Sequence, residues 1–234
     1  MTDDLDFETY LSLSSQKFGI YLLDKKNLKN LYFNEQILKN MTNTLDINLL
    51  EEFLDNNIFK VEKLIGRFIK NITLIIDNEN ILILNLGLKK KNYEKIITQK
   101  FLENCLLELK DLFNEKYQDY KIMHMHIIKY LVDEKQYPKF QIDINCENLR
   151  IEIQFISVPN KFILEIDKIL QKYQIKSINY LNLNYLKNLF QQQKIEISQM
   201  AYRSQLGYNT NEVLMIPKNV KKTGFFEKFF QLFS

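Results

Sequence analysis

Glycine is scarce in this 234-residue sequence, with only five residues that lie far apart. A loop that holds phosphate needs clustered glycines, because only then can several backbone N–H groups approach the anion closely. Neither GxGxxG nor GxxxxGK[ST] occurs in the sequence. The composition therefore argues against an enzyme that binds a nucleotide on its own.

The sequence also has only two cysteines, and it has no long apolar run. The two cysteines, Cys105 and Cys146, each stand alone among alternating apolar and polar residues. A disulfide framework or a zinc site needs more ligands at close spacing, so we expect two buried thiols in a reducing compartment and no metal site. No apolar run is long enough for a membrane-spanning helix, and the start of the sequence, which carries Asp3 and Asp4 and no apolar segment, predicts no signal peptide.

The charge is distributed unevenly along a chain that can otherwise bury a core, since 46% of its residues are hydrophobic and 26% are charged. The net charge of +3 comes entirely from residues 194–234, and residues 1–193 are neutral overall. Such a basic tail favours an anionic surface, either a membrane or a nucleic acid. Because the neutral body lacks a concentrated basic and aromatic patch, we expect no nucleic-acid partner.

Hydrophobic spacing predicts a mixed α+β chain. Strands are expected within 9–36 and at 71–77, 81–88, 120–132, 140–146, 149–158 and 175–181, and helices at 47–70, after Thr98, and at 161–173 and 183–193. Glu147 and Asn148 are predicted to form a hairpin turn. The order suggests one sheet interrupted by an insert; two separate α+β domains are the alternative.

After residue 193, the apolar residues have no clear periodic spacing. Residues 194–222 are predicted to form an extended connector, within which 209–218 has the pattern of a short strand and a turn. That strand could dock on a partner or complete the sheet of this chain. Thr223 is expected to cap a short amphipathic helix over 223–234.

Phenylalanine forms one stripe on this expected terminal helix. Five exposed phenylalanines would promote aggregation, so they must be buried in a bilayer interface, in a partner groove or against the protein itself. Nearby lysines favour an anionic membrane surface. The predicted membrane-binding residues are Phe225, Phe226, Phe229, Phe230, Phe233, Lys221, Lys222 and Lys228.

Several short stretches together resemble the bacterial cell-division protein family FtsA, whose fold is actin-like. The stretch MHMHIIKYLVD at 123–133 is similar to the family's H-x-x-P-x-x-Y-x-V-D, with His124, Tyr130 and Asp133 in place. Ile97-Thr98 and the region 160–181 also resemble family segments, as does the C-terminal GFFEKFFQLF. The resemblance implies half of an actin-like (ribonuclease H-like) fold with an inserted small α+β subdomain and a C-terminal amphipathic helix.

The sequence also differs from the family at positions that matter for nucleotide binding. The family opens with the phosphate-binding turn L-D-x-G-T-S-K, but Ser12 and Ser14 stand here in place of its acid and its glycine. The acid organises metal and phosphate, and the glycine permits close backbone approach. The second half of the fold has no counterpart among these residues, so we expect no cofactor and no enzymatic activity.

The predicted elements and the resemblance together give a division of the chain into domains. Residues 1–77 and 160–193 would form the first actin-like subdomain, 78–159 the inserted subdomain, 194–222 the connector and 223–234 the membrane-binding helix. The resemblance implies a cytoplasmic, non-catalytic adaptor of cell division (a pseudo-ATPase) that is bound peripherally to the inner membrane. Its insert would contact FtsA-like subunits or other division proteins, with a homo-oligomer possible.

Two alternatives remain open at this point. One is a pilus-assembly or secretion scaffold of the PilM type, and the other is an ATP-binding protein that completes its site in trans with a second chain.

Two histidines, His124 and His126, share one strand face, but no convergent third ligand is evident, so a structural role is favoured. Turn and cap roles are favoured for Asp24, Asp77 and Asp133.

Overall fold

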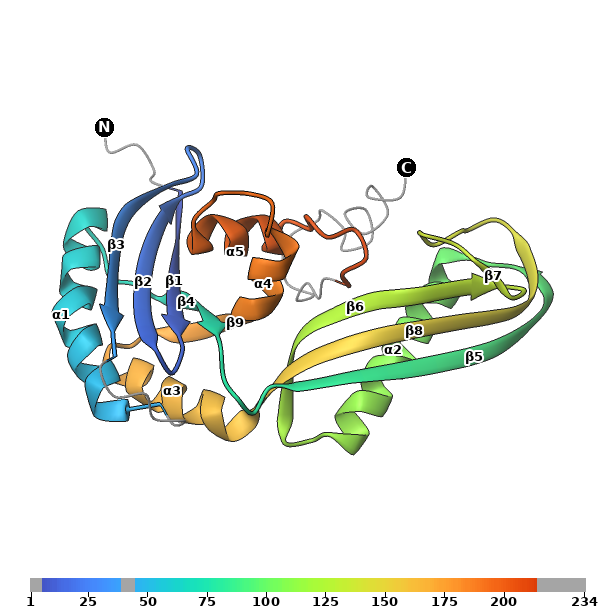
Figure 1. Ribbon diagram of the computed structural model, residues 1–234, viewed down its shortest axis with the longest axis horizontal. Coiled ribbons are helices and arrows are strands. Elements are labelled where there is room, and N and C mark those ends of the chain that lie inside the picture. The colour runs from blue at the N-terminus through green and yellow to red at the C-terminus, as the bar shows by residue number, and fades with distance from the viewer. Residues whose placement is uncertain (1–5, 39–44, 214–234) are drawn as a thin grey trace. The chain divides into compact units, whose positions relative to one another are not determined.

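The computed structural model describes residues 6–38 and 45–213, which form two compact units (Figure 1). The first unit consists of the described residues up to Ile81 together with Val158–Leu206. The second consists of Leu82–Ser157 and the described residues from Gly207 onward. The chain thus leaves the first unit, builds the second and returns.

A mixed five-stranded sheet is the centre of the first unit. Its order is β3-β2-β1-β4-β9, with β1, β2 and β3 antiparallel and β1, β4 and β9 parallel. The strands are β1 (Phe7–Leu13), β2 (Lys17–Asp24), β3 (Lys29–Ile37), β4 (Asn71–Ile76) and β9 (Lys176–Asn182). Because β9 follows the insert and still pairs with β4, the predicted interrupted sheet is confirmed and the alternative of two separate α+β domains is excluded.

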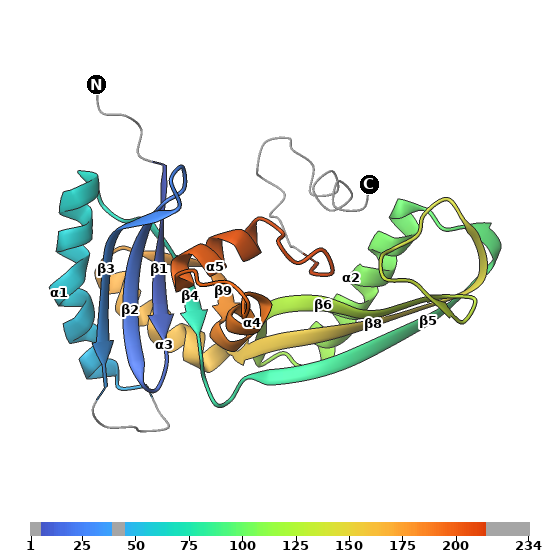
Figure 2. The ribbon, with the colours of Figure 1, turned by 45° about the horizontal axis from the view of Figure 1, so that its top comes forward.

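Helices cover both faces of this sheet (Figure 2). They are α1 (Ile47–Ile65), α3 (Asn160–Lys172), α4 (Leu183–Leu189) and α5 (Ile197–Gln205). Phe53 of α1 packs against Phe18 of β2, with ring centroids 5.9 Å apart. On the other face, Leu186 of α4 and Ala201 of α5 share a buried cluster with Tyr10 of β1. Because helices cover both faces, nearly every residue of β1, β2 and β4 is buried, including the polar Thr9, Ser12 and Thr73.

Helix α1 begins and ends at residues with clear local causes. The Asp46 carboxylate accepts hydrogen bonds from the amides of Asn48 and Leu49, which satisfies donors at the helix start. Gly66 adopts the left-handed conformation at φ 66° and stops the helix. The prediction of a helix to residue 70 was therefore wrong, and Phe68, which that helix would have included, is 79% exposed.

The second unit is a four-stranded sheet of order β5-β8-β6-β7 with helix α2 packed on it (Figure 1). The elements are β5 (Leu82–Ile96), α2 (Gln99–Lys116), β6 (Tyr120–Val132), β7 (Lys135–Gln136) and β8 (Asn145–Pro159). Residues of β5 alternate between partly buried and exposed, as expected for a strand with one solvated face. Stacked Phe113 and Phe155, 4.8 Å apart, join α2 to β8.

Two sequence-based assignments in these regions were wrong. Glu147 and Asn148 form no hairpin turn but lie inside the continuous strand β8, where the Asp133 side chain accepts hydrogen bonds from both of their amides. The expected extended connector contains helix α5. The spacing of Ile197, Met200 and Ala201 places these three side chains on one helical face that packs into the first unit.

The mixed α+β class is confirmed, and the element order matches the one expected for the first half of an actin-like fold. The thiols of Cys105 and Cys146 are buried and free, as predicted. Burial raises the pKa of the Cys105 thiol to about 11, so it stays protonated at neutral pH. Within the described residues, the helices are all too short or too polar to cross a membrane.

Candidate functional site

The turn between β1 and β2 is the first candidate site, because ligands of open α/β sheets bind outside the carboxyl ends of the parallel strands. Strands β1 and β4 end beside this turn, at Leu13 and Ile76, which are register partners. Ser12, at the position of the family's acid, is 2% exposed inside β1. Ser14, at the position of the family's glycine, begins the turn itself.

The Ser14 hydroxyl closes this turn from within. Its oxygen accepts a hydrogen bond from the Lys17 amide at 2.9 Å and a longer one from the Gln16 amide at 3.3 Å, and the hydroxyl lies 3.0 Å from the Lys17 carbonyl oxygen as donor. Backbone amides in such a turn are the donors that would surround a phosphate. Here the side chain of the turn already uses two of them.

The lysine of the turn is engaged as well. Lys17 Nζ lies 2.8 Å from Glu35 Oε2, and the same carboxylate accepts a hydrogen bond from the Tyr21 hydroxyl. Burial of Glu35 opposes its ionisation, but the bonds from Lys17 and Tyr21 outweigh burial and hold the pKa of its carboxyl below the ordinary value. The ammonium group therefore faces a carboxylate of its own sheet.

Among the described residues, a small cavity lies beside the turn. The cavity there has a volume of about 20 Å³ and is lined by Leu13, Ser14, Ser15, Leu45, Asp77, Asn78, Glu79 and Phe162. Small-molecule pockets usually measure roughly 300–1,000 Å³. Of the two acids that line this cavity, Asp77 is held by the structure: its amide donates to the Leu13 carbonyl at 2.9 Å, and its carboxylate accepts from Asn184 Nδ2 at 2.9 Å. The side chains of Ser14 and Asp77 therefore already have partners within the protein.

The residues of the 123–133 motif occupy the second unit and each has a structural partner there. The Tyr130 hydroxyl donates to the Gln141 carbonyl at 3.0 Å, and its ring meets Phe140 edge-on. Asp133 has a positive φ of 47° in the turn after β6 and binds two amides of β8. The predicted turn role of Asp133 is thus confirmed.

His124 forms a buried pair with a residue that sequence reasoning did not connect to it. Its Nδ1 lies 2.5 Å from Glu212 Oε1, and the two side chains are 0% and 4% exposed. Residues 211–213 lie along the edge of β6, where the Ile127 amide donates to the Asn211 carbonyl and the Val213 amide to the Met125 carbonyl, both at 2.8 Å. Of the two expectations for the 209–218 stretch, its described part follows the one in which it completes the sheet of this chain. Among residues 6–38 and 45–213, no three His, Cys, Asp or Glu side chains gather as a metal site would require.

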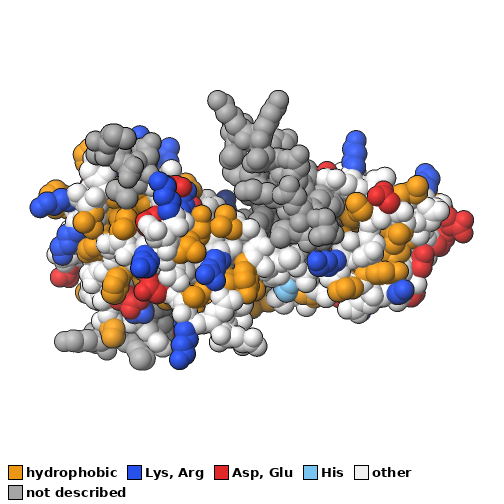
Figure 3. All heavy atoms as spheres, turned by 90° about the horizontal axis from the view of Figure 1, so that it is seen from above, with side chains coloured by type: hydrophobic (Ala, Val, Ile, Leu, Met, Phe, Trp, Pro, Cys, Tyr) orange, Lys and Arg blue, Asp and Glu red, His pale blue; other side chains and the backbone are white. Residues whose placement is uncertain are grey.

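The expected membrane-binding residues lie outside the described residues, so the phenylalanine stripe and its lysines stay a prediction. On the face seen in Figure 3, basic and acidic side chains of the described residues are interspersed.

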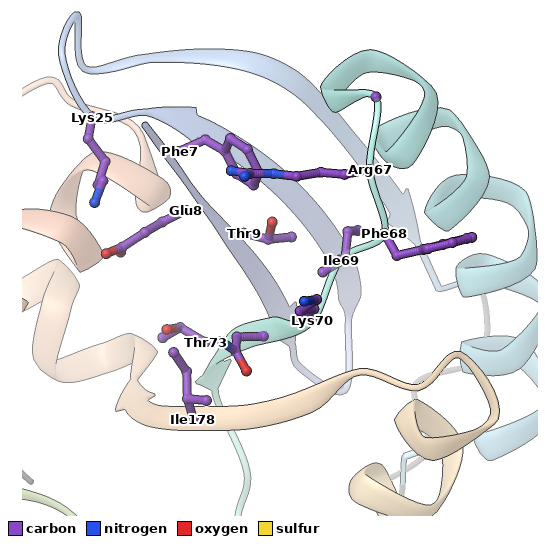
Figure 4. Close-up of a pocket in the computed structure, with 12 residues that line it drawn as sticks. Phe7, Glu8, Thr9, Lys25, Arg67, Phe68, Ile69, Lys70, Thr73 and Ile178 are labelled. Atoms are coloured by element: carbon purple, nitrogen blue, oxygen red, sulfur yellow. The ribbon is translucent and has the colours of Figure 1, made fainter. Parts of the chain in front are cut away.

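Sequence reasoning also missed a cavity of about 710 Å³ at the amino ends of β1 and β4 (Figure 4). No motif indicates it, because its walls come from the start of β1, the residues after α1 and the middle of β9.

Comparison with known proteins gives distant structural similarities only. Neither a family model nor a curated protein matches the sequence. One similar structure is a PilM-PilN type IV pilus biogenesis complex, with 7% identity over 79% of this chain and 51% of that chain and a TM-score of 0.47.

Two further structures are similar to this chain. The cytoplasmic domain of EpsL, an inner-membrane component of the Vibrio cholerae type II secretion system, has 9% identity over 77% of this chain and 57% of its own, with a TM-score of 0.36. A Bacteroides thetaiotaomicron protein with an actin-like ATPase fold has 11% identity over 82% and 60%, with a TM-score of 0.32. None of the three is described as an FtsA protein. The chain spans between about half and three fifths of these structures.

Proposed function

We propose that the chain is a non-catalytic scaffold of the actin-like type, whose β1–β2 turn does not bind nucleotide. The closure of this turn by the Ser14 hydroxyl carries the proposal, since it occupies amides that a phosphate would need. The engagement of Lys17 by Glu35 supports it, because the turn then presents no unpaired cation. The small volume beside Asp77 supports it further.

Calorimetric titration of the full chain with magnesium and ATP tests this part of the proposal. We expect no binding heat up to millimolar nucleotide. The variant Ser14→Gly removes the hydroxyl and places at this position the glycine that the family has. Binding by the parent chain would overturn the proposal and would favour a nucleotide site, either complete or completed in trans. Binding by Ser14→Gly alone would show that the hydroxyl is what blocks the turn.

We further propose that the chain is an adaptor of bacterial cell division. In this role the inserted residues 78–159 contact FtsA-like subunits or other division proteins, and they also contact other copies of the chain. Its support is the set of motif resemblances around His124 and Asp133. Crosslinking of the tagged chain in its own cells, followed by mass spectrometry, separates this role from a pilus or secretion role. Division proteins would uphold the adaptor, whereas pilus or secretion components would replace it with a scaffold of the PilM type.

The membrane part of the proposal concerns the phenylalanine-rich tail. We propose that it holds the protein peripherally on the cytoplasmic face of the inner membrane. Co-sedimentation with anionic liposomes, comparing the full chain with one ending at Thr223, tests this directly. Binding that requires the tail and weakens with salt is expected. Equal sedimentation of the two forms would contradict a tail anchor.

A further inference from the structure

The cavity at the amino ends of β1 and β4 lies at the end of the sheet opposite the β1–β2 turn. Its walls are Phe7, Glu8, Thr9, Lys25, Gly66–Asn71, Thr73 and Ile178 (Figure 4). The volume of about 710 Å³ falls within the roughly 300–1,000 Å³ of small-molecule pockets. All of these residues belong to the first unit, so its own sheet and loops complete the cavity.

Local backbone features shape the cavity. Gly66, in the left-handed conformation, turns the chain out of α1 and directs residues 67–70 across the strand ends. A bulge between β4 and β9 leaves Ile178 without a register partner, since Ile72 pairs with Ser177 and Thr73 with Asn179. Bulges redirect side chains, and here Ile178 forms part of the cavity wall.

The charges of the cavity are divided into two groups. Lys25 lies 2.6 Å from Asp6, and burial of its ammonium is outweighed by the Asp6 and Glu8 carboxylates, which raise its pKa. Figure 4 shows Glu8 pointing toward Lys25 and away from Arg67. On the other side of the cavity, Arg67 and Lys70 form no ion pair with a carboxylate of the described residues. The nearby Glu62 carboxylate accepts a hydrogen bond from the Ile69 amide, at 3.0 Å.

Arg67 is held in an orientation suited to an anion. Its guanidinium carbon lies 4.7 Å from the centroid of the Phe7 ring, so one face of the group stacks on the aromatic ring. The N–H groups at the edge of a stacked guanidinium stay free to donate. This planar fork matches the two oxygens of a carboxylate.

The Thr9 hydroxyl adds a further polar group. Thr9 is 4% exposed as a residue, and its side chain has no hydrogen-bond partner among the described residues, but its oxygen is not fully enclosed. Figure 4 shows its oxygen pointing toward the Phe7–Arg67 pair. Because Thr9 lines the cavity and its hydroxyl has no partner among the described residues, this hydroxyl is available to a ligand. Thr73 also lines the cavity but projects from the opposite face, because it is in register with Tyr10, the neighbour of Thr9.

We propose that this cavity binds a carboxylate carried on an apolar body. Arg67 and Lys70 would hold the carboxylate, the Thr9 hydroxyl would donate to it, and Phe7, Ile69 and Ile178 would contact the apolar part. The carboxylate comes from a free small acid or from an acidic side chain next to an apolar one in a peptide. This site is separate from the β1–β2 turn and does not depend on the proposed function.

An NMR titration of the ¹⁵N-labelled full chain with 3-phenylpropionate tests the proposal, with neutral 3-phenylpropanamide as the matched ligand. The acid should shift the amides of Phe7, Thr9 and Arg67, and the amide ligand should bind at least about tenfold more weakly, because it lacks the charge. Equal binding of the two ligands, shifts confined to other residues, or no shifts at millimolar acid would overturn the proposal.

Variants then test the named residues. Arg67→Gln should weaken binding of the acid about tenfold or more, and Thr9→Val should weaken it a few-fold. Arg150→Gln is the control, since Arg150 is also an exposed arginine but pairs with Glu152 in the second unit. A spectrum with unshifted remote amides confirms that each variant is folded. Equal loss in Arg67→Gln and Arg150→Gln would contradict a role for Arg67 in the site.

Two peptide ligands identify the source of the carboxylate. A capped dipeptide of phenylalanine and glutamate is compared with its glutamine counterpart and with the free acid. Tighter binding of the glutamate peptide than of 3-phenylpropionate would indicate a protein segment, and the reverse order would indicate a small acid. Both outcomes uphold the proposed site, whereas indifference to glutamate or glutamine would contradict it.

Discussion

The two ends of the sheet in the first unit differ in how their polar groups are used. At the carboxyl ends of β1 and β4, the turn is closed by Ser14, its lysine is paired with Glu35, and about 20 Å³ of space remains. At the amino ends, about 710 Å³ is open, and Arg67 and Thr9 lack hydrogen-bond partners among the described residues. The larger cavity thus lies at the end where ligands of open α/β sheets do not usually bind.

This difference shows that a sheet order does not by itself locate a ligand site. The order of elements along the chain is the one that the sequence led us to expect. At the usual end of the sheet, however, Ser14 bonds two turn amides and Lys17 pairs with Glu35. The opposite end is shaped by a helix that stops at Gly66 and by a bulge at Ile178. Local features of a few residues, and not the strand order alone, therefore determine where a cavity lies in this sheet.

The largest expected effect compares two positions of β4. Ile75 is fully buried near the closed end, and Thr73, two residues earlier on the same face, lines the open cavity. Ile75→Ala should lower the free energy of unfolding by about 2–5 kcal/mol, because it leaves a hole in packed surroundings. Thr73→Val should change it by no more than about 0.5 kcal/mol, since the hydroxyl has no protein partner in the described structure. Urea unfolding followed by circular dichroism measures both, and equal losses would contradict the comparison.

A smaller effect is expected at the turn. Ser14→Ala removes the acceptor of the Gln16 and Lys17 amides and should lower the free energy of unfolding by about 0.5–1.5 kcal/mol. Hydrogen exchange of these two amides should become faster in the variant. As a control, exchange at Thr9 and Arg67 should stay as in the parent. Unchanged exchange at Gln16 and Lys17 would show that the hydroxyl does not close the turn in solution.

The smallest effect concerns pH. The pKa of Glu35 is lowered in the folded state, so its contribution to stability is present above the unfolded pKa and is lost as the pH falls through the folded value. Lys17→Gln should raise the folded pKa toward the ordinary value. The stability difference between parent and variant should therefore be seen at neutral pH and vanish in acid. It should be small, because both side chains are about a third exposed, 34% for Lys17 and 35% for Glu35. A carboxyl titration by NMR checks the pKa, and an unchanged value would contradict the pairing.

Local sequence patterns predicted most elements of the fold, because burial on one or both faces imposes a visible spacing. They failed where a long-range contact decides the conformation. Asp133 keeps Glu147 and Asn148 in a strand although their sequence favours a turn. Helix α5 is short, and its apolar face is recognisable only beside the cluster that it covers.

The candidate sites were predictable only in part, for a related reason. Ser12 and Ser14 are adjacent to a recognisable strand and could be identified from the sequence. The partner of His124 is 88 positions away at Glu212. Phe7, Arg67 and Ile178 meet only because the parallel strands bring their amino ends together. Spacing along the chain carries no signal for such a cavity.

A single NMR experiment tests the contrast between the two ends most directly. One labelled sample of the full chain is titrated first with magnesium and ATP and then with 3-phenylpropionate, while the amides of Ser12–Lys17 and of Phe7, Thr9 and Arg67 are followed. The account predicts that nucleotide leaves the turn amides unmoved and that the acid shifts the amides at the open end. Nucleotide-dependent shifts at Ser14, Gln16 and Lys17 would contradict it.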